Sequence, residues 1–287
     1  MRIKRTPGEW IFDTCNYAFL AFLGIVCLYP LWYVFCAAFS DPISLAATDD
    51  PLLLPINFSF ESVIYVMQND RIWNGFWQST RLLVYGTLWN MFCTIICAYP
   101  LSRRDFMLRR PVMLMITFTM FIGGTLSAVY LNMQELGFTP ERGLINLLIP
   151  FSIGTYNMVI MRTAIEGMPE SLVEAARIDG AGHLRVIWNL VLPLTKATIA
   201  VLAMFFAVAH WNNWFWPTYL LNRKDQVLAV VLNQLLDPQN FELDPSFMKL
   251  EGMRHAAVVI SSAPILCMYP FVQKYFTKGV MIGAVKQ

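Results

Sequence analysis

The chain has 287 residues, of which 57% are hydrophobic and 14% are charged, which is too little charge to cover a soluble domain of that length. The formal net charge is +2, and no basic segment is gathered to follow a nucleic-acid backbone, so composition indicates no nucleic-acid partner. The apolar residues come in long blocks, which indicates a membrane protein.

Six apolar blocks are each long enough to cross a bilayer as a helix, which takes about 20 residues. We therefore expect an all-α membrane protein with about six transmembrane helices, forming a single domain over residues 1–287. The expected spans are about 15–39, 76–101, 111–133, 144–163, 195–219 and 255–276.

The first block follows a basic start that includes Arg2, Lys4 and Arg5, as a signal peptide would. It continues to Phe39, however, which is too long for a signal peptide, and no small-residue cleavage site stands out beyond it. We interpret it as a retained membrane anchor.

Polar side chains fall within three of the expected spans. Such groups are costly against lipid unless they face protein or water, so we expect these spans to face a central cavity. The polar residues are Arg81 in the second span, Asn146, Asn157 and Arg162 in the fourth, and His210, Asn212 and Asn213 in the fifth.

Lysine and arginine residues divide unequally between the two sides of the membrane that six spans define. The richer side is normally cytoplasmic, and it includes both ends of the chain, so both termini are predicted to be cytoplasmic. The segment Ser102–Arg110, with four arginines, is the strongest anchor. The fourteen basic residues on the richer side are Arg2, Lys4, Arg5, Arg103, Arg104, Arg109, Arg110, Arg162, Arg177, Arg185, Lys196, Lys274, Lys278 and Lys286, against seven on the other.

One predicted cytoplasmic segment, about residues 168–193, differs from an ordinary loop. Pro169 and Glu170 suit the first turn of a helix, and Gly180 suits the left-handed conformation that ends one. A second short helix is expected from about His183 to Val191. The alternative is an amphipathic helix resting on the membrane surface. The ordered spacing of acid, alanines, glycine and Leu-Pro argues against that alternative.

This segment resembles the motif of permease subunits in binding-protein-dependent ABC importers. The motif reads Glu-Ala-Ala, three residues, Gly, nine residues, an aliphatic residue, one residue, and Leu-Pro. The matching residues are Glu174, Ala175, Ala176, Gly180, Leu190, Leu192 and Pro193, with leucine at position 190 where isoleucine is common. The Asp179-Gly180-Ala181 turn and residues 211–215 are similar to the sugar-importing branch, and residues 275–286 are similar to its complex-oligosaccharide subgroup, of alginate type.

The resemblance implies the ABC importer permease fold, in the bacterial cytoplasmic (inner) membrane, and a coupling helix that docks on an ATPase. It implies a second, usually different permease, two cytoplasmic ATPase subunits that bind ATP and magnesium, and an extracytoplasmic solute-binding protein. The residues implied in coupling are Glu174, Ala175, Ala176, Asp179, Gly180, Leu190 and Pro193.

Other functional classes find little support in the sequence. There is no GxxxxGK[ST] phosphate loop, so ATP would have to bind another subunit, and no HExxH metal motif or convincing catalytic pairing. The six cysteines form no CxxC pair, and we interpret them as apolar filler. A secondary transporter usually carries charged residues at mid-membrane, whereas the groups here are mostly neutral. A permease for a non-sugar solute remains an alternative.

Aromatic rings and amides suit a sugar, and two of the expected spans supply them. An aromatic belt at the membrane surface and hydrogen bonds between helices are the competing interpretations. The candidates for the substrate path are Tyr156, Asn157, His210, Trp211, Asn212 and Asn213.

Overall fold

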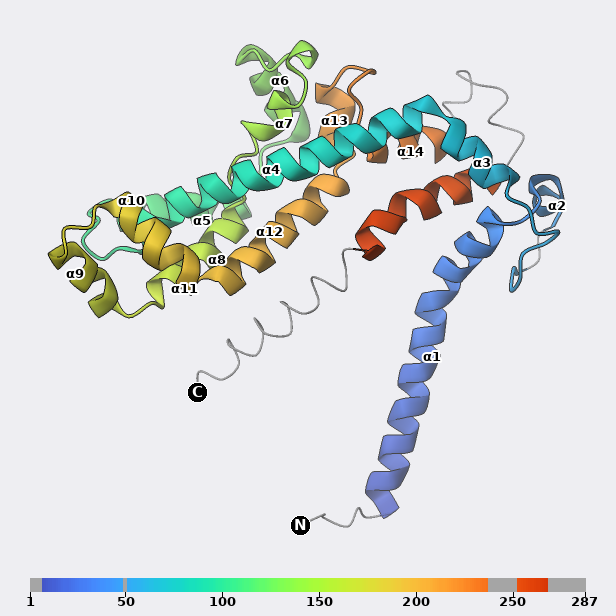
Figure 1. The fold of residues 1–287 in the computed structure, drawn as a ribbon, viewed down its shortest axis with the longest axis horizontal. Helices are drawn as coiled ribbons and strands as arrows, with labels where there is room; N and C mark the ends of the chain where they lie inside the picture. Colours follow the sequence, from blue (N-terminus) through green and yellow to red (C-terminus); the bar gives the residue numbers. More distant parts are fainter. Residues whose placement is uncertain (1–6, 49–50, 237–251, 268–287) are drawn as a thin grey trace. The chain divides into compact units, whose positions relative to one another are not determined.

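A computed structural model describes residues 7–48, 51–236 and 252–267. These residues form helices joined by turns and loops, without a strand among them, so the all-α prediction is confirmed (Figure 1). Contacts divide the chain into two units, Met1–Asp70 with Gln234–Ala263, and Arg71–Asn233 with Pro264–Gln287. The expected end of the last span, 268–276, and residues 275–286, which are similar to the complex-oligosaccharide subgroup, lie outside the described residues.

The first unit is built around α1 (Pro7–Ala38), a helix of 32 residues whose apolar side chains are mostly exposed. The segment after α1 packs back against the C-terminal part of this helix, where the Trp32 indole N–H donates to the Leu53 carbonyl at 2.8 Å. The Ser40 hydroxyl accepts from the Ile56 N–H at 3.0 Å. The unit also contains α2 (Pro42–Ala46), α3 (Glu61–Gln68) and most of the helix Gly252–Cys267.

The second unit carries the remaining helices, apart from the first residue of α4 and the last three residues of α14, and its largest core joins α4, α8 and α12. Its elements in order are α4 (Asp70–Ser102), α5 (Arg109–Phe121), α6 (Leu126–Glu135), η1 (Pro140–Arg142), α7 (Ile145–Leu148), α8 (Thr155–Glu166), α9 (Glu170–Ile178), α10 (His183–Val186), η2 (Ile187–Val191), α11 (Leu192–Leu194), α12 (Lys196–Trp211), α13 (Phe215–Leu220) and α14 (Leu228–Leu236).

Several expected spans are interrupted. Within the described part of the chain, α1 and α4 are the two continuous helices that are long and apolar enough to cross a membrane. The expected third span breaks at residues 122–125, where Gly123 and Gly124 follow α5. The fourth is divided between α7 and α8, and α12 meets the preceding helix at a bend of 86°. Six complete spans therefore stay a prediction.

A glycine of α4 lets α12 approach closely. A Cβ atom added at Gly86 would lie 2.6 Å from Nε2 of His210, far inside normal contact distance. The same Nε2 lies 3.3 Å from Oδ1 of Asn90, one helical turn further along α4. His210 is thus buried between two helices, where the absent side chain of Gly86 makes room for its ring.

We expect Gly86→Val to destabilise the protein by about 1–3 kcal/mol, the usual cost of overpacking a core. Adding His210→Ala should restore much of that loss, because it removes the ring that the valine meets. Gly24→Val is the matched control, since a Cβ atom there meets nothing within 4 Å. The measurement is thermal unfolding of the purified protein in detergent. Equal midpoints for Gly86→Val and Gly24→Val would contradict the packing described here.

Candidate functional site

The residues of the motif form a helix, a tight turn and a second helix. The first helix, α9, begins at Glu170, one residue later than expected, with Pro169 preceding it in an extended conformation. Val173 is buried, and Ala176 packs one turn further along against the core shared by α4, α8 and α12. These two side chains orient α9, so that Glu174 and Ala175 face solvent.

The turn after α9 requires glycine. Gly180 has φ +76°, in the left-handed region that side chains with a Cβ atom avoid. The Ala181 N–H donates to the Ala176 carbonyl at 2.9 Å, and the Gly180 N–H to the Arg177 carbonyl at 3.0 Å. This pair of bonds is the Schellman motif, which satisfies the last carbonyls of a helix. The predicted left-handed helix end at Gly180 is confirmed.

The second helix runs from His183 to Leu194 and contains a π-helical turn at Ile187–Val191. Pro193 lacks an N–H group, so the regular bond to the carbonyl four residues earlier cannot form there. Leu190 is half-buried on the core, whereas Pro193 is exposed. The chain then bends by 86° into α12, and the Thr195 hydroxyl donates to the Val191 carbonyl at 2.6 Å.

Large apolar side chains project from this element into solvent. Ile178, the last residue of α9, is 87% exposed, and Leu184 and Trp188 on the second helix are 77% and 73% exposed. Exposed large apolar groups on one helix–turn–helix element suit a surface that binds another molecule. These three residues are not among those predicted from the motif, although the four-residue spacing of Leu184 and Trp188 places both on one face of a short helix.

Two contacts fasten the element to the end of α4 and the loop that follows. The Arg177 guanidinium donates to Asp105 at 3.1 Å, and this hydrogen bond lowers the pKa of Asp105 and raises the pKa of Arg177. Both groups are exposed, so the pair contributes only about 0–1 kcal/mol. The Tyr99 hydroxyl lies 3.2 Å from Nδ1 of His183. Of the element at residues 168–193, α9 is therefore held to the loop after α4, and the second helix to the end of α4 itself.

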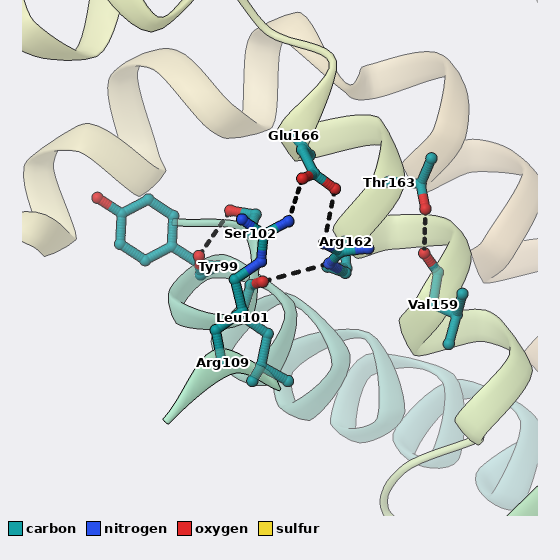
Figure 2. A network of polar contacts seen from close by, with 8 residues as sticks. All are labelled: Tyr99, Leu101, Ser102, Arg109, Val159, Arg162, Thr163 and Glu166. Atoms are coloured by element: carbon teal, nitrogen blue, oxygen red, sulfur yellow. Dashed lines mark hydrogen bonds and ion pairs between the residues drawn. The ribbon is translucent and has the colours of Figure 1, made fainter. Parts of the chain in front are cut away.

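A second ionic network joins α4, α5 and α8 beside the element (Figure 2). Glu166 pairs with Arg109 through one carboxylate oxygen and with Arg162 at 2.7 Å through the other. Arg162 also donates from Nε to the Leu101 carbonyl at 3.2 Å. One carboxylate thus fixes the two helices, α5 and α8, near the end of α4.

The comparisons with known proteins identify the family. Residues 90–282 match the binding-protein-dependent transport system inner membrane component family. The chain belongs to this family. The resemblance predicted from the motif is therefore confirmed, and the protein is a membrane component of a transport system.

Relatives matched over nearly their whole length, and a solved structure, are also components of transport systems. The chain is 31% identical to the polygalacturonan/rhamnogalacturonan transport system permease protein YtcP of Bacillus subtilis, over 96% of this chain and 98% of that protein. It is 24% identical to the arabinooligosaccharides transport system permease protein AraQ of Halalkalibacterium halodurans, over 100% of both. The structure of a bacterial ABC transporter involved in the import of the acidic polysaccharide alginate matches with a TM-score of 0.88 and 28% identity, covering 96% and 99% of the two chains.

The substrate-path candidates of this permease lie in different surroundings. Tyr156, near the start of α8, is 61% exposed, and Asn157 beside it is half-buried. Asn212, just after α12, is exposed and donates to the Val208 carbonyl of its own helix at 3.1 Å. Asn213 is half-buried. The path through these four residues stays a prediction.

His210 and Trp211, the other two candidates, are buried against α4. His210 packs on Gly86, and Trp211 meets the Phe76 ring edge-on with 5.7 Å between ring centroids. This burial favours a packing role for both side chains over contact with a substrate.

Proposed function

We propose that this permease is a transmembrane subunit of an ATP-driven importer that carries an oligosaccharide into the cytoplasm. The observation that carries the proposal is the exposed helix–glycine–helix element, with its Schellman turn at Gly180 and its apolar side chains in solvent. Such a surface suits docking of a protein. The sugar permeases among the relatives support the substrate class.

The energy would come from other subunits. The sequence has no phosphate-binding loop of its own, so ATP and magnesium would bind two cytoplasmic ATPase subunits. A second permease, which the family resemblance implies to be a different chain, would complete the pathway. A solute-binding protein on the outer side would deliver the substrate, which agrees with the description of the family as binding-protein-dependent.

The substrate we favour is an oligosaccharide released from an acidic polysaccharide. The permease at 31% identity is named for polygalacturonan and rhamnogalacturonan, and the solved transporter at 28% imports alginate. The test is ATP hydrolysis by the reconstituted importer, with its binding protein, in the presence of oligogalacturonate, oligoalginate or maltodextrin. Stimulation by a uronate oligosaccharide supports the proposal, and stimulation by maltodextrin alone contradicts the acidic class.

We also propose that the element at residues 168–193 and both termini face the cytoplasm. The four arginines of the neighbouring segment Ser102–Arg110 agree with this orientation, because basic residues favour the cytoplasmic side. A reporter that is active only outside the cytoplasm should be silent when fused after Gly182 and active when fused after Gly137. The reverse pattern would show that the orientation is inverted.

Tyr156 and Asn213 are proposed to line the substrate path. Replacing either with alanine should weaken the apparent affinity for substrate by up to about tenfold, the effect of losing one hydrogen bond of about 0.5–1.5 kcal/mol. Thr163→Ala is the control on α8, because the Thr163 hydroxyl donates to the Val159 carbonyl of its own helix (Figure 2). The measurement is uptake kinetics, with assembly of the complex checked by co-purification. Unchanged kinetics in both variants would mean that other residues line the path.

A further inference from the structure

An open cavity of about 690 Å³ lies where the loop after α4 meets the start of α5 and the end of α8. Every polar residue that lines this cavity is an arginine. A concentration of guanidinium groups in a hollow favours an anion, and arginine in particular suits phosphate. The lining residues are Arg104, Arg109, Arg110, Arg162, Phe106, Met107 and Met113.

The positive charge of this cavity is only partly balanced. Glu166 pairs with two of its arginines, Arg109 and Arg162. Arg104 and Arg110 form no ion pair with any residue in the part of the chain that the structure describes. The neighbouring carboxylate, Asp105, is engaged by Arg177. The cavity therefore keeps an excess of positive charge for a ligand.

An apolar groove adjoins the basic cavity. It has a volume of about 490 Å³, and Phe106 is a lining residue of both hollows. On α5, Leu114, Met115 and Phe118 are exposed as well, so apolar surface continues along this helix away from the arginines. The groove is lined by Cys97, Pro100, Leu101, Phe106, Val112, Met115, Ile116, Thr119, Ile153, Thr155 and Met158.

We propose that the cavity and the groove together bind one anionic phospholipid, with its phosphate among the arginines and an acyl chain along the groove. A free phosphate ion would use only the cavity, whereas a phospholipid uses both, because it joins a negative headgroup to an apolar chain. Basic pockets beside transmembrane helices are suited to anionic headgroups. The site belongs to this chain alone and does not depend on the transported substrate.

The test is native mass spectrometry of the purified full-length chain, with any subunits that co-purify, after mixing with phosphatidylglycerol or phosphatidylcholine. We expect the wild-type protein to retain phosphatidylglycerol in preference to phosphatidylcholine. The double variant Arg104→Gln/Arg110→Gln should bind phosphatidylglycerol about 30-fold more weakly, at about fivefold for each arginine beside an anionic surface. Both side chains are exposed, so the variant should fold normally.

The control is Arg223→Gln/Lys224→Gln, which removes the same charge at exposed positions outside the cavity and should bind phosphatidylglycerol as the wild type does. Inorganic phosphate and glycerophosphoglycerol, which lack acyl chains, should displace phosphatidylglycerol only in large excess. Equal retention by all three proteins, or equal retention of the two lipids, would overturn the proposal. Displacement by inorganic phosphate at equal concentration would assign the cavity to a free anion. Loss of a co-purifying ATPase from the double variant, without loss of lipid, would assign it to a protein partner.

Discussion

Replacing Gly180 with valine is expected to abolish substrate-stimulated ATP hydrolysis and transport, while the protein still inserts in the membrane. An added Cβ atom would meet nothing within 4 Å, so the cost arises from the backbone, which holds φ +76° at this residue. A β-branched residue in that region costs about 1–3 kcal/mol, and relief of the strain opens the Schellman turn. The second helix would then leave α9 in a different direction. The measurement is ATP hydrolysis and uptake by the importer reconstituted in vesicles.

Two further variants separate backbone conformation from side-chain size. Gly182→Val adds the same side chain two residues later, where φ is −69° and the space is also open, so coupling should be unaffected. Gly180→Asn should keep part of the activity, because asparagine tolerates the left-handed region better than other residues with a Cβ atom. Normal coupled transport by Gly180→Val would remove the turn from the mechanism.

Placing a charge on the exposed apolar surface of the element should prevent docking of the ATPase. Ile178 is 87% exposed, so Ile178→Asp should not disturb the fold of this chain. In a docked complex the carboxylate would lie in an apolar contact, and we expect affinity for the ATPase to fall at least about 30-fold, or about 2 kcal/mol, as for a central interface residue. The measurement is the amount of ATPase subunit that co-purifies with the permease.

The control for this variant is Leu136→Asp, which places the same charge at an exposed aliphatic residue that directly follows α6. It should leave co-purification unchanged. If Ile178→Asp and Leu136→Asp retained the ATPase equally, Ile178 would not belong to the docking surface.

The local features of the coupling element could be predicted from the sequence, because they depend on neighbouring residues. A glycine after a run that favours helix predicts the left-handed end, and the structure has it at Gly180. Which apolar residues face solvent could not be predicted. Val173 and Ile178 are both aliphatic residues of α9, yet one is buried in the core and the other is almost fully exposed. That difference is set by α4 and α8, which are distant in the sequence.

Contacts between distant segments also lie beyond what a single span of sequence can predict. His210 is a substrate-path candidate because it is a polar residue in an apolar span, and this role stays a prediction. The His210 ring packs against α4 at Gly86, where the lack of a side chain leaves room for it, and its Nε2 lies beside the Asn90 amide. Likewise, hydropathy alone does not detect the helix break at Gly123 and Gly124. The phenylalanine and isoleucine directly before them keep the mean hydropathy of this stretch high.

We propose that the element at residues 168–193 docks on an ATPase subunit, and site-specific cross-linking in native membranes tests this docking most directly. Ile178→Cys, in a chain whose six native cysteines are replaced by serine, would be treated with a short thiol-to-amine cross-linker, beside Leu136→Cys in the same background as the matched exposed position. We predict a cross-linked product between position 178 and an ATP-binding subunit, and no such product from position 136. Absence of that product from position 178, in membranes where the complex is assembled and transports substrate, would contradict the account.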